Sequence, residues 1–66
     1  MKLTVNGEEK SVGEGLTLSQ LLRELGLEKN PIAVELNRQV VPRDRHAATR
    51  LAEGDRLEIV TLVGGG

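Results

Sequence analysis

Residues 2–12 read KLTVNGEEKSV, which is the pattern of a β-hairpin. Polar and apolar side chains alternate from Lys2 to Asn6, and this period of two is typical of a half-buried strand. Asn6 and Gly7 both tolerate a positive φ, so this pair is the strongest short-range signal for a hairpin turn. Residues 8–12 are then expected to return antiparallel, with a charged, wet outer face.

A short helix is predicted next, over residues 18–25. Thr17 and Gln20 have the spacing of a capping box at a helix start. Gly26 stands where a left-handed C-terminal cap belongs, and Leu27 can fold back onto the helix. The apolar face of this helix comprises Leu18, Leu21, Leu22 and Leu25. Because only one face is apolar, the helix needs a sheet to pack against.

Three more strands are expected in the second half of the chain. They are predicted at residues 32–36, 39–41 and 56–63. Asn37 and Arg38 form a tight turn between the first two, and Pro42 stops the second. The polar segment 43–50 is expected to be irregular, with room for one helical turn.

The order of these elements predicts an α+β fold. A helix that crosses one face of a mixed sheet is the simplest arrangement that buries every apolar stripe. We therefore expect a ubiquitin-like β-grasp roll of about five strands with one main helix on one face. The last strand is expected to pair with the first, in the middle of the sheet. Residues 1–63 would form the domain and residues 64–66 a flexible glycine tail.

Length and composition exclude many classes of function. A chain of 66 residues buries only about 60% of its unfolded surface, which leaves little room for an active-site cleft of its own. The chain has no cysteine and one histidine, so a disulfide scaffold, a thiol nucleophile and a His- or Cys-based zinc site are all excluded. We therefore expect a non-enzyme without a bound metal or cofactor.

Charge and hydropathy argue against nucleic-acid and membrane partners. The formal net charge is -1, and the chain has no Phe, Tyr or Trp that could stack on bases. An apolar run long enough to span a bilayer and a signal-peptide pattern are both missing from the sequence. These features favour a cytoplasmic domain that is handled by other proteins.

The run of three glycines at positions 64–66 is the most informative chemical feature. Glycine lacks a Cβ, so such a segment can thread a narrow channel. Val63 and the glycines, fully extended, would reach roughly 13 Å beyond the sheet. That reach would place a carboxylate of Gly66 in a partner's active site, where it must first be activated as an acyl phosphate or acyl adenylate. The alternative is that the glycines only fray, as chain ends usually do.

The sequence resembles the ThiS family, the sulfur carriers of thiamine biosynthesis, and less closely the small subunit of molybdopterin synthase. The resemblance covers essentially the whole chain and includes the leucine-rich helix. Its other motifs are Asn6-Gly7, Ala33-Val34-Glu35-Leu36-Asn37, Val40-Val41-Pro42-Arg43, Gly54-Asp55, Leu57-Glu58-Ile59-Val60 and the terminal glycines. Three glycines stand where the family usually has two, and His46 stands where relatives commonly have an aromatic residue.

The resemblance implies that a partner similar to ubiquitin-activating enzymes adenylates the terminal glycine with ATP. Sulfur from a cysteine desulfurase or another donor then converts it to a thiocarboxylate, and thiazole synthase takes up this sulfur. Carried over, Gly66 would bear the sulfur, Gly65 would be its required neighbour and Gly64 would extend the flexible segment.

A docking surface is expected near the end of the last strand. Leu57 and Ile59 point one way along this strand, whereas Val60 and Leu62 point the other way, where the helix cannot cover them. We predict that Val60 and Leu62, joined by Val41, form an exposed apolar patch that docks partners.

Two further features in the second half are charged or titratable. His46 is expected to be a solvated or capping side chain. The arginines could form one basic face that steers the domain towards an acidic partner; they are Arg38, Arg43, Arg45 and Arg50.

Three classes of function remain open. The chain could be a sulfur carrier, a protein modifier that ends in an isopeptide bond, or an interaction module whose tail does no chemistry. Among sulfur carriers, the thiamine type is preferred over the molybdopterin type because of the short chain and the motif at residues 40–43.

Overall fold

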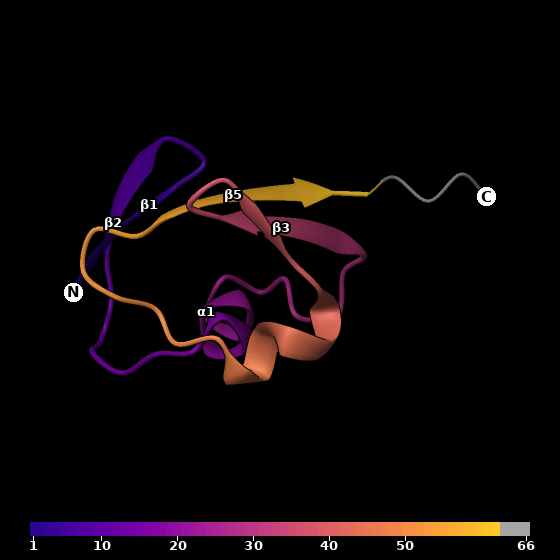
Figure 1. Cartoon of the computed structure of the whole chain (residues 1–66), viewed down its shortest axis with the longest axis horizontal. Helices are drawn as coiled ribbons and strands as arrows, with labels where there is room; N and C mark the ends of the chain where they lie inside the picture. Colours follow the sequence, from indigo (N-terminus) through magenta and orange to yellow (C-terminus); the bar gives the residue numbers. More distant parts are fainter. Residues whose placement is uncertain (63–66) are drawn as a thin grey trace.

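The computed structural model of the chain describes residues 1–62. Its elements are β1 (Lys2–Val5), β2 (Glu8–Ser11), α1 (Leu18–Glu24), β3 (Ile32–Leu36), β4 (Gln39–Val41), the 3-10 helix η1 (Arg43–Ala48) and β5 (Arg56–Thr61). The strands form a single layer, and α1 and η1 lie together on one side of it (Figure 1). The predicted α+β architecture is confirmed.

The strand order in the sheet is β2-β1-β5-β3-β4. Strand β5 pairs parallel with β1 and antiparallel with β3, which makes the sheet mixed. The prediction that the last strand lies next to the first, in the middle of the sheet, is therefore confirmed. The tip of β5 points away from the β1–β2 hairpin (Figure 1).

The first hairpin closes at the predicted turn. Asn6 has a φ of 50° and Gly7 a φ of 82°, so both central residues are left-handed, as a type I′ turn requires. Strand β2 ends at Ser11, one residue earlier than predicted. Val12 nevertheless continues the pairing, because its N–H donates to the Met1 carbonyl at 2.8 Å.

Helix α1 is held at both ends by the groups that the sequence indicated. The Gln20 N–H donates to Thr17 Oγ1 at 3.2 Å, and the Thr17 N–H donates to Gln20 Oε1 at 2.8 Å, which completes the capping box. At the other end Gly26 has a φ of 74°. The Leu27 N–H reaches back to the Leu22 carbonyl at 2.8 Å, as in a Schellman cap.

The hydrophobic core lies between the sheet and α1. Its members come from strands β1, β3 and β5 and from helix α1. Leu51, in the segment after η1, completes the core. The buried apolar residues are Leu3, Val5, Leu18, Leu21, Leu22, Ile32, Val34, Leu51, Leu57 and Ile59. Every second residue of β5 thus contributes to the core, which leaves the alternate residues on the opposite face.

Two segments differ from the predicted pattern. The polar segment expected to hold one helical turn is a six-residue 3-10 helix, η1, that begins after Pro42 and packs against α1. Strand β5 ends at Thr61 rather than at residue 63. The predicted boundary between domain and tail at Val63 lies outside the described residues.

Candidate functional site

The site is built around β5, because this strand leads to the glycine run. Two asparagines, one from each flanking hairpin, fasten its backbone. Asn6 Nδ2 donates to the Ile59 carbonyl at 3.1 Å, and the Ile59 N–H donates to Asn6 Oδ1 at 2.7 Å. On the other side, the Arg56 N–H donates to Asn37 Oδ1 at 3.0 Å. These side-chain contacts hold β5 on both sides, as additional backbone hydrogen bonds of the sheet would.

The outer face of the sheet carries exposed apolar side chains near the end of β5. Val60 is 57% exposed and Leu62 is 48% exposed, as the alternation along β5 predicted. Val40 on β4 is 70% exposed. Since Val40 pairs with Glu35 and Glu35 pairs with Glu58, Val40 lies on the same face as Val60. We call Val40, Val60 and Leu62 the outer apolar patch.

The predicted contribution of Val41 to this exposed patch is wrong. Val41 pairs with the buried Val34, so its side chain points to the α1 side of the sheet. There it is partly buried and packs against the core. The two-residue turn after Leu36 sets this register, and the register puts Val40 outside instead. Sequence reasoning missed Val40, although pairing Leu36 with Gln39 across the turn would have found it.

The middle of the outer face is acidic. Glu35 and Glu58 lie directly opposite each other on β3 and β5, and both are exposed. Like charges in directly opposed positions destabilise a strand pair slightly. Negative charge therefore lies beside Val40 on β4 and next to Val60 along β5, between the members of the outer apolar patch on these two strands.

His46 is buried, which corrects the expectation of a solvated or capping side chain. It is only 7% exposed, and its Nε2 lies 3.0 Å from the Val41 carbonyl oxygen. A carbonyl oxygen can only accept, so Nε2 carries the proton and donates. His46 thus joins η1 to the end of β4. The surrounding residues of 43–50 are polar, and this pattern gave no sign that one of them would be buried.

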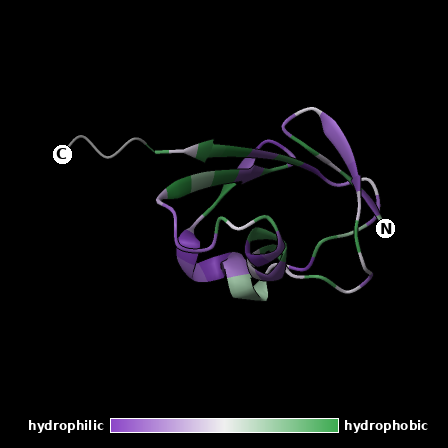
Figure 2. Cartoon of the chain, turned by 180° about the vertical axis from the view of Figure 1, so that it is seen from behind, coloured by the Kyte–Doolittle hydropathy of each residue, from purple (hydrophilic) through white to green (hydrophobic). Residues whose placement is uncertain are grey.

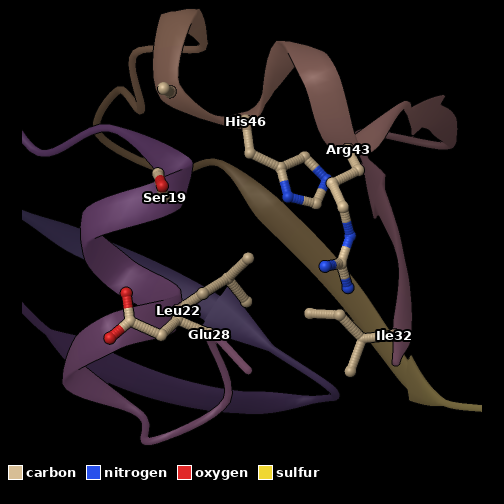
Figure 3. Close-up of a pocket in the computed structure, with 7 residues that line it drawn as sticks. Ser19, Leu22, Glu28, Ile32, Arg43 and His46 are labelled. Atoms are coloured by element: carbon tan, nitrogen blue, oxygen red, sulfur yellow. The ribbon is translucent and has the colours of Figure 1, made fainter. Parts of the chain in front are cut away.

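A pocket of about 140 Å³ lies between α1 and η1, beside the His46 ring. Ser19 and Leu22 line it from α1, and Arg43 from η1 (Figure 3). The guanidinium of Arg43 donates to the Asn30 carbonyl at 2.9 Å, so this arginine is occupied by a structural contact.

The arginines of the second half do not act as one basic face. Arg43 lines the pocket beside His46, whereas Arg45 lines a separate groove along β4. Arg38 lies in the turn before β4 and has a left-handed φ of 71°. Two of the four arginines of the expected basic face thus line different clefts, and Arg38 and Arg50 line neither.

Gly64, Gly65 and Gly66, which the sequence singled out as the carrier segment, lie outside the described residues. Within residues 1–62, no group of three His, Cys, Asp or Glu side chains is placed to hold a metal ion. In the same part of the chain, no helix has the length and apolar character needed to cross a membrane.

Comparison with known proteins shows which family has this arrangement. A model of the ThiS family matches residues 2–66. The chain belongs to the ThiS family. The resemblance drawn from its motifs is thereby confirmed across the glycine run as well as the folded part.

Proteins of known name or structure agree with this membership. A crystal structure of the thiamine biosynthesis protein ThiS from Geobacter metallireducens is 38% identical, has a TM-score of 0.86 and covers 100% of both chains. The sulfur carrier protein ThiS of Thermus thermophilus is 37% identical over 94% of this chain and 95% of that protein. The fold is thus the ThiS form of the β-grasp, and the Thermus relative is named a sulfur carrier.

A different kind of relative is also similar. A thiazole synthase of Paramagnetospirillum magneticum is 44% identical over 100% of this chain, but the chain spans only 20% of that protein's length. A ThiS-like segment therefore occurs inside a longer thiazole synthase chain.

Proposed function

We propose that this ThiS-family chain is the sulfur carrier of thiamine biosynthesis and that the carboxylate of Gly66 carries the sulfur. The observation that carries the proposal is the match to the ThiS family through residue 66, which includes the glycine run. The thiamine route is preferred to the molybdopterin route because the similar carriers are named for thiamine biosynthesis.

The chemistry takes place in partner enzymes. A carboxylate is a poor electrophile, so an activating enzyme would join it to the AMP part of ATP and release pyrophosphate. A sulfur nucleophile at the oxidation level of sulfide would then attack the acyl carbon. AMP leaves, and a C–S bond replaces one C–O bond. A cysteine desulfurase is the proposed origin of this sulfur. It delivers sulfur as a persulfide, so a thiol reductant must supply two electrons, either to release sulfide before the attack or to cleave the acyl disulfide that the persulfide forms. Thiazole synthase is the proposed acceptor of the sulfur.

The outer apolar patch is proposed to dock these partners. Val60 and Leu62 are exposed on the strand that leads to the glycines, so a partner that covers them also lies beside the tail. The thiazole synthase that contains a ThiS-like segment supports this partner, since a segment similar to this chain lies there within a protein named thiazole synthase. Val40 extends the patch onto β4, whereas Val41 faces the core.

Mass spectrometry of the intact chain tests the carrier role. The chain is incubated with ATP, an activating enzyme and a sulfur donor, and is measured before and after alkylation of thiols. Alkylation is needed because exchange of oxygen for sulfur adds nearly the same mass as oxidation of Met1. The chain has no cysteine, so a rapidly alkylated product must carry new sulfur, and fragmentation locates it. We expect the label on Gly66.

Matched variants separate the roles of the glycines. One extra residue after Gly66 should abolish labelling, since the carboxylate would be displaced from the reacting centre. Gly64→Ala is the control: labelling that survives it but not Gly65→Ala would limit the requirement to the last two glycines. Failure of the unmodified chain to be labelled by an enzyme that loads another ThiS protein would refute the carrier role.

The protein-modifier alternative has a different signature. Under that alternative, the activated carboxylate ends in an isopeptide bond, and a mixture of lysine-containing proteins yields conjugates of higher mass. A pure carrier gives the alkylated species without conjugates. Neither product is expected if the chain is only an interaction module.

A further inference from the structure

Strand β4 is an edge strand of the sheet, and the backbone N–H and C=O of one of its residues are not directed at the neighbouring strand. The Asn37 N–H donates to the Arg56 carbonyl, and the Leu62 N–H donates to the Pro31 carbonyl. In an antiparallel pair every second residue hydrogen-bonds to the partner strand, so the odd-numbered residues from 31 to 37, including Glu35, hydrogen-bond to β5. Since Val40 is the partner of Glu35, the N–H and C=O of Val40 point away from β3, to the open edge.

A groove runs along this edge between β4 and η1. Its lining combines apolar side chains with one amide, one cation and one hydroxyl: Leu36, Gln39, Val40, Val41, Pro42, Arg45 and Thr49. The side chain of Val40 is 70% exposed beside it. The groove thus offers a donor and an acceptor on the backbone, an apolar wall and a positive charge.

Basic residues outnumber acidic ones in the segment that borders the groove, whereas Glu35 lies opposite Val40 on the outer face. Residues 38–50 contain four arginines and a single acidic residue, Asp44, in a chain of formal net charge -1. The first turn of η1 is strongly hydrophilic in Figure 2. Arg38 stands in the turn before β4, and Arg45 lines the groove itself. An extended ligand along β4 would therefore meet positive charge.

We propose that the edge of β4 binds an extended, acidic segment of a partner protein by strand addition. One residue of that segment pairs with Val40 and exchanges two backbone hydrogen bonds with it. Its side chain lies beside Val40 on the outer face. The residues on either side point to the inner face, where a carboxylate meets Arg45. The recognised pattern is a β-branched residue between two acidic ones.

The opposite edge of the sheet and a second copy of the chain fit this pattern less well. Strand β2 presents Glu8 and Glu9, which would repel an acidic segment. Pairing β4 with β4 of a second copy would bring Arg38 and Arg45 of both copies together. Nucleic acid has no strand edge to pair with Val40. Charge complementarity therefore favours an acidic peptide.

A peptide titration followed by NMR tests this inference. The probe is a short, end-capped peptide that alternates valine with aspartate, added to the full isotope-labelled chain. We expect shifts in the backbone amides of residues 39–41 and in the Nε–H of Arg45, together with slower hydrogen exchange at the Val40 amide. The peptide in which lysine replaces aspartate is expected to leave these signals unchanged.

Two variants and a matched control make the test decisive. Val40→Pro removes the edge N–H without removing a bond to β3, and should abolish the shifts. Arg45→Glu should weaken binding by about fivefold. Arg50→Glu makes the same charge change outside the groove, so it should leave the affinity within about twofold.

Several outcomes would overturn the proposal. They are shifts confined to β2 or to Val60 and Leu62, equal binding of the lysine peptide, an affinity unchanged by Arg45→Glu, and displacement of the peptide by a short oligonucleotide. The titration involves no step at Gly66, so its failure would leave the sulfur-carrier proposal standing, and the reverse also holds.

Discussion

Asn6 combines two roles that are usually separate. Its backbone takes the left-handed conformation that the first hairpin turn requires, and its side chain exchanges two hydrogen bonds with Ile59 on β5. A residue at a turn therefore contributes to pairing in the centre of the sheet. Asn37 repeats the arrangement in the second hairpin, where its side chain accepts from Arg56 and donates to Asp55.

Asn6→Ala is expected to lower the free energy of unfolding by about 2 kcal/mol. The substitution removes both hydrogen bonds to Ile59 and places a less suitable residue at positive φ. Asn6→Gly is the matched variant, because it relieves the conformational cost while still removing the hydrogen bonds. Urea unfolding measures both. If the two variants are equally stable, the backbone conformation contributes nothing to the loss.

His46 is the second residue whose environment is set by distant parts of the chain. His46→Ala should cost about 2 kcal/mol, since it leaves a cavity under η1 and removes the bond to the Val41 carbonyl. His46→Phe keeps the buried volume, and the Val41 carbonyl is still directed at β3, where it pairs within the sheet. This substitution should therefore lower the free energy of unfolding by less than about 1 kcal/mol. Thermal unfolding distinguishes these values. A loss for Phe as large as that for Ala would show that the hydrogen bond, which both variants lose, outweighs the packing.

These residues also show how far sequence reasoning reaches. Asn6 and Gly7 were identified from the chain alone, because a type I′ turn restricts which residues can occupy it. The burial of His46 was not foreseen, since it depends on how η1 returns beneath the sheet, and no local periodicity encodes that path. The face of Val41 was wrong for a related reason: it follows from strand register rather than from hydropathy.

At the scale of the elements, α1 depends on its ends. The helix spans only seven residues, which is shorter than an isolated helix needs to be stable in water. Packing of three buried leucines supplies one part of its stability. The capping box and the Schellman cap supply the other, because they satisfy backbone groups that the short helix leaves free.

Thr17→Ala is expected to destabilise the protein by about 1 kcal/mol, because the Gln20 N–H loses its acceptor. Thr17→Ser keeps the hydroxyl and should stay within about 0.5 kcal/mol of the parent. Combining Thr17→Ala with Gln20→Ala in a double-mutant cycle measures the coupling within the box. Strictly additive effects would mean that the two hydrogen bonds do not support each other.

At the scale of the whole molecule, the sheet has one covered face and one open face. Adjacent residues on β5 belong to different faces: Ile59 is buried in the core and Val60 is exposed. The alternation that predicted this division was correct for β5. What the sequence could not give is how the faces of separate strands combine, and so Val40 was missed as part of the outer apolar patch.

The pair Ile59→Ala and Val60→Ser should therefore differ sharply in stability. Ile59→Ala is expected to cost about 3 kcal/mol, since it opens a cavity in the core. Val60→Ser should change the free energy of unfolding by less than about 0.5 kcal/mol, while it weakens binding to the activating enzyme. Chemical denaturation and a binding titration check the two effects. A Val60→Ser loss as large as that of Ile59→Ala would show that the outer face is covered in the free protein.

The central position of β5 has a consequence for how the chain is made. β5 is the last described strand to leave the ribosome, yet it lies between β1 and β3. Until residues 56–61 have emerged, the nascent chain holds two hairpins with no strand to join them. Folding of the sheet must therefore wait until β5 has been made, and contacts between distant parts of the sequence make such folding slow. A chain cut short before β5 would be left with two hairpins that share no sheet, and it would lack the strand that leads to the glycine run.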